Sequence, residues 1–387
     1  MLKILEKINI YYVVLFSLIV KLVVFFLIPN LEFPDSRTYM KAGIELFEEK
    51  QIQIHNVMPL QPIIAYLLQE QEFLKIFNII ISSLTIFLIY QLSLKLFKGN
   101  TYAMLAAVIA AIYPYFIFYS ITGLTESLYI FLLLSVFLLL YNQKFFLASL
   151  VLVISILHRP ILDPLAPILI FVFAFYLHQF SLKNSMLKVL QYVLVYIVLM
   201  FPWWLHQYNK YDNFVRLNLG EGLVWYAGNN PLNKSGGGVL GGTKGTDLDI
   251  TQFTHIENYF ERDKVMKQYA LDFIVNNPTR FIELAGLKFI RFWRLWPYAP
   301  EYEKVHYIII SLMSYGVMLL LSIIFLIKYL KNYFRMILPI LLLVGYFTIV
   351  HMILIASIRY RLPLEPFLII FASYSLINIM KKREDAS

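Results

Sequence analysis

The chain has 387 residues, of which 60% are hydrophobic and only 15% are charged, and its mean hydropathy is +0.68. A soluble domain usually carries about 25% charged residues, so this composition excludes an ordinary soluble enzyme and favours a membrane protein. The net charge of +9 is spread over short Lys-rich turns, which argues against nucleic acid as a partner. The absence of Cys excludes both a disulfide framework and a thiolate metal site.

About ten segments of the sequence are long and apolar enough to cross a bilayer as helices, at roughly 17–25 residues each. In chain order these expected spans are residues 9–28, 73–97, 102–121, 124–141, 144–157, 160–178, 187–205, 305–327, 335–355 and 363–380. No small-residue cleavage site follows the first span, so we expect a retained helix rather than a signal peptide. The expected fold class is all-α, a polytopic integral membrane protein built as a helical bundle.

Basic residues gather in every second turn between the expected spans. They are Lys3 and Lys7, Lys95 and Lys98, Lys144, Lys183 and Lys188, Lys328, Lys331 and Arg335, and finally Lys381, Lys382 and Arg383. Lys and Arg accumulate in cytoplasmic loops, so both termini and these turns are expected inside the cell. We expect a multi-pass protein of a bacterial inner or plasma membrane, with the remaining turns on the non-cytoplasmic face.

Two outer segments are too long to be simple turns, and they divide the chain into three regions. Residues 29–72 form a first outer loop within an N-terminal bundle that ends at residue 205. Residues 206–304 form a large outer loop, and residues 305–387 carry the last spans. The Gly-rich stretch 234–245 is expected to be a mobile lid, whereas helical patterns over roughly 252–275 and 278–295 predict ordered helices.

The first outer loop carries the strongest candidate for catalysis. Asp35 or Ser36 is a suitable N-cap for a short amphipathic helix on the membrane surface, which Tyr39 continues at helical spacing. Asp35 either only caps this helix or acts as a base. Its place at the outer interface, where a carboxylate meets both lipid headgroups and water-borne acceptors, favours the base.

Further ionisable groups share the outer face. Glu126 and Asp163 each lie about one turn inside a span, where a charge is costly and faces protein or a watery cavity. They either pair with Arg159 or His158 to fix helix ends, or take part in chemistry. His55, on the same face, either contacts an acceptor or a metal or is an ordinary surface histidine.

Arginine side chains on the outer face are candidates for holding phosphate, because a guanidinium group matches phosphate oxygens bidentately. Arg159, Arg359 and Arg361 all lie there. Arg359 and Arg361 either share a side of an extended chain or diverge on a helix, and Leu362, which precedes a proline, is expected to be extended. A basic aromatic helix at 286–297 is expected to anchor at the membrane surface.

Several short segments, taken in chain order, resemble the marks of one enzyme superfamily. They are Pro34–Gly43, Met58–Pro62, Thr125–Tyr129, His158–Pro160, Pro202–Trp204, Gly228–Pro231, Asn277–Phe281 and Arg359–Pro363. Together they resemble GT-C glycosyltransferases of the protein O-mannosyltransferase and aminoarabinose-transferase type. The resemblance covers nearly the whole chain and rests on the order of the segments.

The resemblance implies an inverting glycosyltransferase that takes a sugar from a polyprenyl-phosphate carrier and passes it to a lipid, glycan or protein acceptor on the non-cytoplasmic face. It implies Asp35 as the base, with Arg159, Arg359 and Arg361 on the donor phosphate. Supporting roles then fall to Tyr39, His55, Glu126, His158 and Asp163. Many members carry an Asp-Glu pair where this chain has Asp35 and Ser36, so the cofactor, a divalent metal or none, stays open.

Two other function classes compete with this interpretation. A transporter or flippase for lipid-linked saccharides should place ionisable groups and broken helices near the midplane. The clustering of ionisable groups at one face favours the enzyme. A polymerase or ligase would differ chiefly in using a diphosphate-linked donor, which the sequence does not exclude.

Overall fold

The computed structural model describes residues 5–29, 31, 33–48, 54–238, 248–297, 302 and 304–384. Helix accounts for 79% of the structure, and the described ranges contain no strand. The prediction of an all-helical fold is therefore confirmed. Long apolar runs explain this outcome, since they favour helices, whose backbone groups are paired within the segment.

The helices, in chain order, have the following bounds. They are α2 (Ile10–Leu27), α3 (Pro34–Phe47), α4 (Leu60–Leu68), α5 (Gln71–Phe97), α6 (Asn100–Ala111), α7 (Pro114–Ser120), α8 (Glu126–Tyr141), α9 (Phe145–His158), η1 (Pro160–Leu162), α10 (Ala166–Phe171), η2 (Val172–Leu177), α11 (Leu182–Tyr211), α12 (Glu221–Gly228), η3 (Thr251–Phe253), α13 (Tyr259–Asn276), α14 (Pro278–Trp293), α15 (Val305–Ser311), η5 (Leu312–Gly316), α16 (Val317–Ile353), α17 (Ile358–Arg361), η6 (Leu362–Leu364) and α18 (Glu365–Glu384).

Five helices among the described residues are long and apolar enough to cross a membrane. They are Ile10–Leu27, Gln71–Phe97, Leu182–Tyr211, Val305–Ile353 and Ile358–Lys382. The pair α6 and α7, bent by 52°, would make a sixth, and α8, α9 and the segment Ala166–Leu177 are shorter apolar helices. These helices support a multi-pass membrane protein, while the count of ten crossings stays a prediction.

The helix Val305–Ile353 covers two of the expected spans without an interruption. Drawn straight, its 49 residues would extend about 73 Å at 1.5 Å per residue, far more than a bilayer core. Both of its ends instead contact the same helix region. Near one end the Ser311 hydroxyl donates to the Leu295 carbonyl, and at the other Lys288 Nζ donates to the Ile353 carbonyl at 2.9 Å.

The middle of that helix lies at the opposite end of the bundle. Arg335 Nη2 donates to the Leu177 carbonyl at 2.8 Å, and the Tyr141 hydroxyl donates to the Met336 carbonyl at 2.5 Å. Tyr141 and Leu177 close helices that begin near the outer loops, so the chain turns back near Arg335. The helix continues through residues 328–334 because this stretch contains neither Gly nor Pro, which is why the expected turn is helical.

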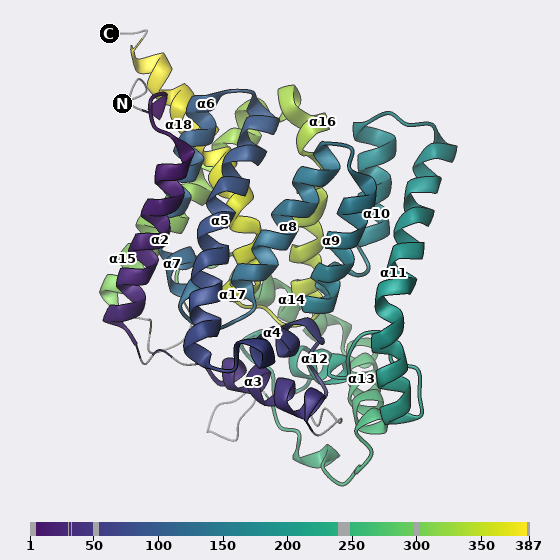
Figure 1. The fold of residues 1–387 in the computed structure, drawn as a ribbon. Coiled ribbons are helices and arrows are strands. Elements are labelled where there is room, and N and C mark those ends of the chain that lie inside the picture. Colours follow the sequence, from purple (N-terminus) through teal and green to yellow (C-terminus); the bar gives the residue numbers. More distant parts are fainter. Residues whose placement is uncertain are drawn as a thin grey trace.

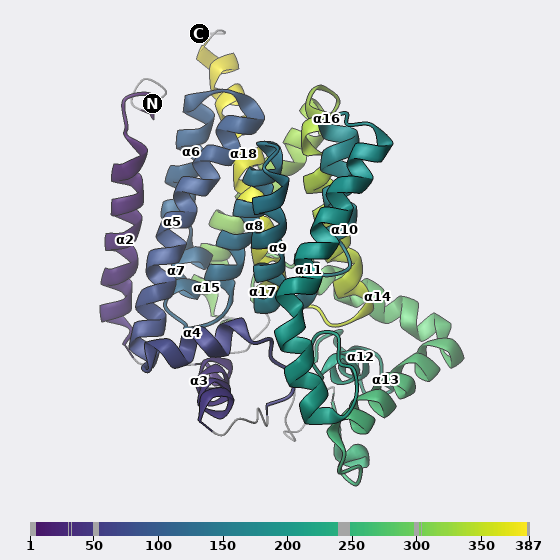
Figure 2. The same cartoon turned by 45° about the vertical axis from the view of Figure 1, so that its right-hand side comes forward.

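The ends of the helices divide the molecule into two sides. In Figure 1 the start of α2 and the end of α18 lie together at one end, and α3, α4, α12 and α13 lie at the other. Figure 2 shows α3 and α4 under one part of the bundle and α12 and α13 under another. The two long segments between spans therefore form one cap on the bundle, which we call the outer cap.

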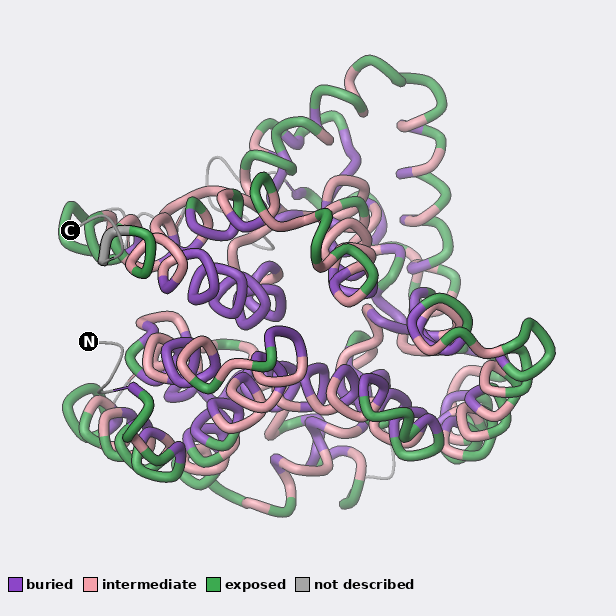
Figure 3. Tube along the Cα trace, turned by 90° about the horizontal axis from the view of Figure 1, so that it is seen from above, coloured by how far each residue is buried: buried purple, intermediate pink, exposed green. Residues whose placement is uncertain are grey.

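Burial separates central from peripheral helices. In the most apolar 18-residue stretch of the last span 78% of the residues are buried, against 22% for Leu182–Tyr211. The helix α18 is therefore central and α11 is peripheral. Figure 3 shows the same contrast, with buried stretches inside and exposed ones around the rim. Large apolar side chains such as Phe16 and Phe26 on α2 and Val198 on α11 are exposed, as suits helices that face lipid.

The outer cap is held by close backbone approaches. A Cβ on Gly43 would come within 2.5 Å of the Pro62 carbonyl, so glycine permits α3 to pack on α4. Asp263 accepts hydrogen bonds from the backbone N–H groups of Gly222 and Leu223 at 3.1 and 3.3 Å, which caps α12 and joins it to α13. The expected lid at 234–245 lies outside the described residues from position 239 onwards.

Candidate functional site

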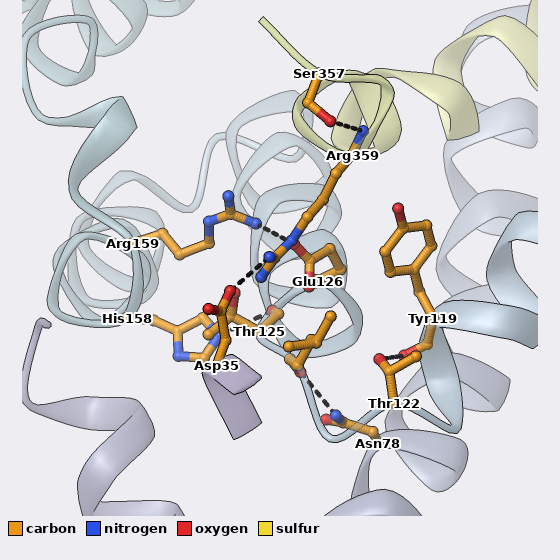
Figure 4. A network of polar contacts seen from close by, with 11 residues as sticks. Asp35, Asn78, Tyr119, Thr122, Thr125, Glu126, His158, Arg159, Ser357 and Arg359 are labelled. Atoms are coloured by element: carbon orange, nitrogen blue, oxygen red, sulfur yellow. Dashed lines mark hydrogen bonds and ion pairs between the residues drawn. The ribbon is translucent and has the colours of Figure 1, made fainter. Parts of the chain in front are cut away.

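Four charged side chains from distant parts of the chain meet between the bundle and the outer cap. They are Asp35 at the start of α3, Glu126 at the start of α8, Arg159 after α9 and Arg359 in α17. Figure 4 shows them converging, and we call them the outer cluster. Its two carboxylates and two guanidinium groups make the cluster neutral overall.

Arg359 joins the two carboxylates. Its Nη1 lies 2.6 Å from Asp35 Oδ2, and its Nε donates to Glu126 Oε1. The short helix α17 aims this side chain, because the Ser357 hydroxyl accepts the Arg359 backbone N–H at 3.3 Å and so caps the turn. Asp35 and Arg359 are 324 positions apart, so the first outer loop is tied directly to the last span.

Glu126 is the buried centre of the cluster. It is the first residue of α8, where the helix dipole favours a carboxylate. Its Oε1 accepts from both Arg359 and Arg159, the latter at 3.0 Å, while Oε2 has no hydrogen-bond partner among the described residues. A buried carboxylate of this kind depends on its cationic partners, since removing them would leave an uncompensated charge.

Exposure rises from Glu126 towards the surface. The Glu126 side chain is fully buried, those of Arg159 and Arg359 are 18% and 22% exposed, and that of Asp35 is 50% exposed. Asp35 is therefore the member of the cluster that a ligand approaching from the outer side meets first.

Neighbouring polar groups orient the cluster. His158 Nε2 lies 3.0 Å from the Thr125 carbonyl, so Nε2 carries the proton and the imidazole supports the turn that presents Glu126. Tyr39 lies within the electrostatic field of Asp35 and Arg359, and burial raises the pKa of its hydroxyl above the ordinary value. Tyr39 therefore stays a neutral phenol that can donate a hydrogen bond near Asp35.

Tyr119 is a member of the site that sequence reasoning missed. Figure 4 places its ring on the far side of Arg359 from Arg159. It also lines a small cavity of about 10 Å³, together with Ser82, Thr85 and Ser127. This space holds about one water molecule, so the cavity itself is too small for a sugar.

Arg361 lies apart from the outer cluster. Its Nε lies 3.0 Å from Glu365 Oε1, and its Nη1 donates to the carbonyls of Phe292 at 3.1 Å and Arg294 at 2.7 Å. Its guanidinium carbon lies 3.4 Å from the centre of the Tyr315 ring, and the side chain is fully buried. These contacts, which we call the sealed network, fasten the end of α14 to α18.

The backbone explains why Arg359 and Arg361 separate. Residues 358–361 are helical, so side chains two positions apart point in different directions. The expectation that Leu362 is extended is wrong, since its φ of −49° and ψ of −37° are helical. Pro363 falls in the first turn of η6, a position where proline is tolerated.

Asp163 and His55 also lie outside the outer cluster. Asp163 Oδ2 pairs with Arg216 Nη2 at 2.5 Å rather than with Arg159 or His158. His55 Nδ1 lies 2.5 Å from the Tyr211 hydroxyl, and its ring stacks on Tyr259 at 3.8 Å between centroids. Burial, with a smaller effect of nearby Lys210, lowers the pKa of His55 to about 4, so the imidazole is neutral. Its contacts connect the first outer loop to α11 and α13.

Lys288 of α14 is turned inward rather than towards a membrane surface. Lys288 is fully buried, and its Nζ donates to Asn229 Oδ1 at 3.0 Å and to the Ile353 carbonyl at 2.9 Å. Burial lowers its pKa to about 7. The exposed residues of this helix include Ile282 and Ile290, so the surface that it offers to lipid is apolar rather than basic.

No metal centre is apparent in the described ranges, which contain no group of three or more His, Asp or Glu side chains suited to a cation. Asp35 and Glu126, the two carboxylates of the outer cluster, are both engaged by Arg359. The residues of the cluster thus fit an anion better than a cation.

Comparison of the chain with protein-family models and with curated proteins finds no match. The fold and the site define a class of protein: within the described ranges it is all-helical, has five helices suited to crossing a membrane and carries a carboxylate and guanidinium cluster under an outer cap. A half-exposed carboxylate beside two partly exposed guanidinium groups can accept a proton and bind an anion.

Proposed function

We propose that this protein is a membrane glycosyltransferase of the GT-C type, which transfers a sugar from a polyprenyl-phosphate carrier to an acceptor on the non-cytoplasmic face. The observation that carries the proposal is the contact of Asp35 with Arg359 at 2.6 Å at the outer side of an apolar bundle. A carboxylate and a guanidinium group lie side by side there, at the end of the bundle where we expect a lipid-linked donor to present its headgroup. The sequence resemblance described above points to the same chemistry.

The proposed reaction is a single displacement at the anomeric carbon. The acceptor oxygen forms a bond to that carbon while the bond to the phosphate oxygen breaks, and the electron pair leaves with the phosphate. Asp35 takes the acceptor proton, as a general base. The phosphodiester carries one negative charge before transfer and the released phosphate carries two, while Asp35 becomes neutral, so charge is conserved and the anomeric configuration inverts.

Arg359 and Arg159 are the proposed phosphate clamps. A phosphate leaving group needs no general acid, but it needs cations that absorb the charge growing in the transition state. Both guanidinium groups are held by buried Glu126 and are partly exposed on the outer side. Glu126 acts as a positioning residue that fixes the spacing of the two arginines.

The activity is tested with purified protein in lipid nanodiscs, short-chain polyprenyl-phosphate sugars and a panel of lipid, glycan and peptide acceptors, with products identified by mass spectrometry. We expect transfer by the wild type and none by Asp35→Asn. Glu221→Gln is a matched control, because Glu221 is a similarly exposed carboxylate of the outer cap, paired with Lys267 at 2.7 Å. Normal turnover by Asp35→Asn would remove Asp35 as the base.

The proposed orientation in the membrane is tested with single cysteines, since the chain has none of its own. Thr254→Cys lies on the outer cap and Lys183→Cys lies at the other end of the bundle, and both positions are exposed. A membrane-impermeant maleimide added to intact cells or spheroplasts should label residue 254 alone. Labelling of residue 183 instead would overturn the proposed non-cytoplasmic site.

A flippase for lipid-linked saccharides is the second candidate, favoured by one observation within α2. Lys21 is fully buried there, and its Nζ has no hydrogen-bond partner among the described residues. Buried ionisable groups inside spans often mark transport paths. In proteoliposomes, Lys21→Met should abolish translocation of a fluorescent polyprenyl-phosphate sugar if the protein is a flippase, whereas the proposed transferase should move no lipid.

A further inference from the structure

The two proposed roles of Asp35 and Arg359 exclude each other while these side chains remain in contact. Asp35 Oδ2 occupies the Nη1 group of Arg359 at 2.6 Å. A carboxylate held in this ion pair is a poor base for an acceptor, and a phosphate that binds Nη1 of Arg359 must take the place of Asp35. The arrangement must therefore change before catalysis, and the structure indicates which contact changes.

We propose that Asp35 occupies the donor-phosphate subsite in the resting protein, and that a singly charged phosphodiester displaces it from Arg359 and so releases it as the base. The inference rests on the proposed function and deepens it. It makes base activation a consequence of donor binding, and it selects a monophosphate-linked donor over a diphosphate-linked one.

Asp35 is the exchangeable ligand because its partner carboxylate is fixed. Glu126 is fully buried and holds Arg359 and Arg159 together, so its departure would strand a buried charge. Asp35 is half exposed, and an ion pair of this exposure contributes only about 0.2–1 kcal/mol. A phosphate that binds the guanidinium fork can outcompete it, because such contacts are bidentate and charge-assisted.

The backbone beneath Asp35 is held in place, so the exchange needs only a rotation of the side chain. Ser36 is buried, and its hydroxyl donates to the Phe33 carbonyl at 2.7 Å. It also packs on the turn before α8, where a Cβ on Gly123 would come within 3.3 Å of Ser36 Cβ. Released from Arg359, Asp35 would remain at the outer side of the cluster, beside the bound donor.

Charge balance identifies the ligand class. With Asp35 in place the outer cluster is neutral, and without it the cluster carries one positive charge, from Arg159 and Arg359 less Glu126. A phosphodiester brings one negative charge and makes the sum over these three residues and the ligand zero. A diphosphate-linked donor brings two and leaves that sum at one negative charge, next to Glu126 and the displaced Asp35, so we expect it to bind more weakly.

The same exchange resets the site after transfer. The acceptor proton neutralises Asp35, which then no longer competes for Arg359 while the released phosphate carries two negative charges. Loss of that proton to water restores the carboxylate, which returns to Arg359 once the product has left. Asp35 would thus act on donor affinity as well as on the acceptor.

The test is the affinity of wild type and Asp35→Asn for farnesyl methyl phosphate, a phosphodiester without a sugar, measured by titration calorimetry in nanodiscs. Removal of a competitor that contributes about 1 kcal/mol should tighten binding about five-fold, although turnover is lost. Asp35→Ala, which also removes the hydrogen-bond acceptor, should gain at least as much. Glu221→Gln should leave the affinity unchanged, and farnesyl methyl diphosphate, which carries two negative charges, should bind the wild type more weakly than the diester.

Each outcome separates the exchange from the proposed function. Unchanged or weaker diester binding by both Asp35 variants, together with sugar transfer by the wild type, would overturn the exchange and leave the transferase standing. A five-fold gain in affinity without transfer of any sugar would support the anion subsite and overturn the transferase. Tighter binding of the diphosphate than of the diester would overturn the inferred ligand class.

Discussion

Arg359 and Arg361 belong to the same turn of the chain, yet they lie in two different environments. Arg359 joins two carboxylates in the outer cluster, and part of its side chain reaches the outer side. Arg361 pairs with Glu365 in the sealed network, donates to two carbonyls at the end of α14 and has no exposed surface. The cluster has an exchangeable partner, whereas every contact of the sealed network is enclosed by protein.

The difference teaches that an arginine and carboxylate pair is not by itself a functional site. In the sealed network each partner of Arg361 lies in the interior, so removing the arginine changes folding before it changes binding. In the outer cluster, Arg359 can exchange Asp35 for another anion at little cost to the fold. Variants of the two arginines should therefore affect different measurements.

The largest effect is expected for Arg361→Ala on the stability of the fold. Its loss leaves Glu365 as an uncompensated buried charge, and breaking a buried pair in this way costs about 3–5 kcal/mol. Thermal unfolding in nanodiscs should show a strongly lowered midpoint or no folded protein. The double variant Arg361→Met with Glu365→Leu should recover much of the stability, and failure to recover any would contradict a purely structural pair.

A large effect on turnover, with a smaller effect on unfolding than that of Arg361→Ala, is expected for Arg359→Ala, because Arg159 still pairs with buried Glu126. Loss of a group that stabilises transition-state charge reduces turnover by about 10²–10³-fold. Arg359→Lys keeps the charge but loses the bidentate fork, so its turnover should be intermediate. A melting temperature reduced as much as in Arg361→Ala, with residual turnover unaffected, would remove the distinction between the two arginines.

A smaller effect, a dependence of stability on pH, is expected from Lys288, which is buried in α14 near the sealed network. Burial lowers its folded pKa to about 7 from 10.5, so the unfolded chain binds more protons between these values and stability rises with pH. We expect a gain of roughly 1–2 kcal/mol between pH 7 and pH 9. Lys288→Met should abolish this rise, and an identical pH profile in the variant would show that Lys288 is charged when folded.

The smallest effect, a loss of local stability at acid pH, is expected from His55 in the first outer loop. The folded pKa of His55 is about 4 and its ordinary value is 6.5, so its contribution is complete above pH 6.5 and is lost as pH falls towards 4. The hydrogen-exchange protection factors of residues 54–58 should therefore fall in this window. His55→Phe keeps the ring on Tyr259 without titrating, and an unchanged acid response in this variant would exclude His55 as its source.

The sequence was sufficient for the helical class and for the outer candidates that depend on hydropathy. Asp35, Glu126, Arg159 and Arg359 all stand at the outer ends of apolar runs, and the structure brings them together. Their pairing was not predictable, because it joins four elements across 324 positions and depends on how the helices pack. The position of a charged residue along an apolar segment predicts at which end of the bundle it lies, but not which residue it pairs with.

The residues whose positions or partners the sequence did not predict are explained in the same way, by contacts with distant parts of the chain. Lys288 has the spacing of an interfacial anchor, but its ammonium group is buried because it donates to Asn229 Oδ1 and to the Ile353 carbonyl. Asp163 pairs with Arg216, a residue that no motif singled out. Tyr119 lies in an apolar stretch, where a tyrosine is indistinguishable from core packing until the cavity beside it is known.

The origin of Arg359 near the end of the chain has a consequence for the order of synthesis. Asp35, Glu126 and Arg159 leave the ribosome early, and Arg359 arrives only after the outer cap and the reversing helix α16 have been made. Until then Glu126 has Arg159 alone as its partner, and Asp35 has no cation in the cluster. Domains of a growing chain generally fold from the N-terminal end. A nascent chain truncated before α17 would therefore carry three quarters of the cluster and no phosphate clamp at Asp35, so competence would arise only with the last span.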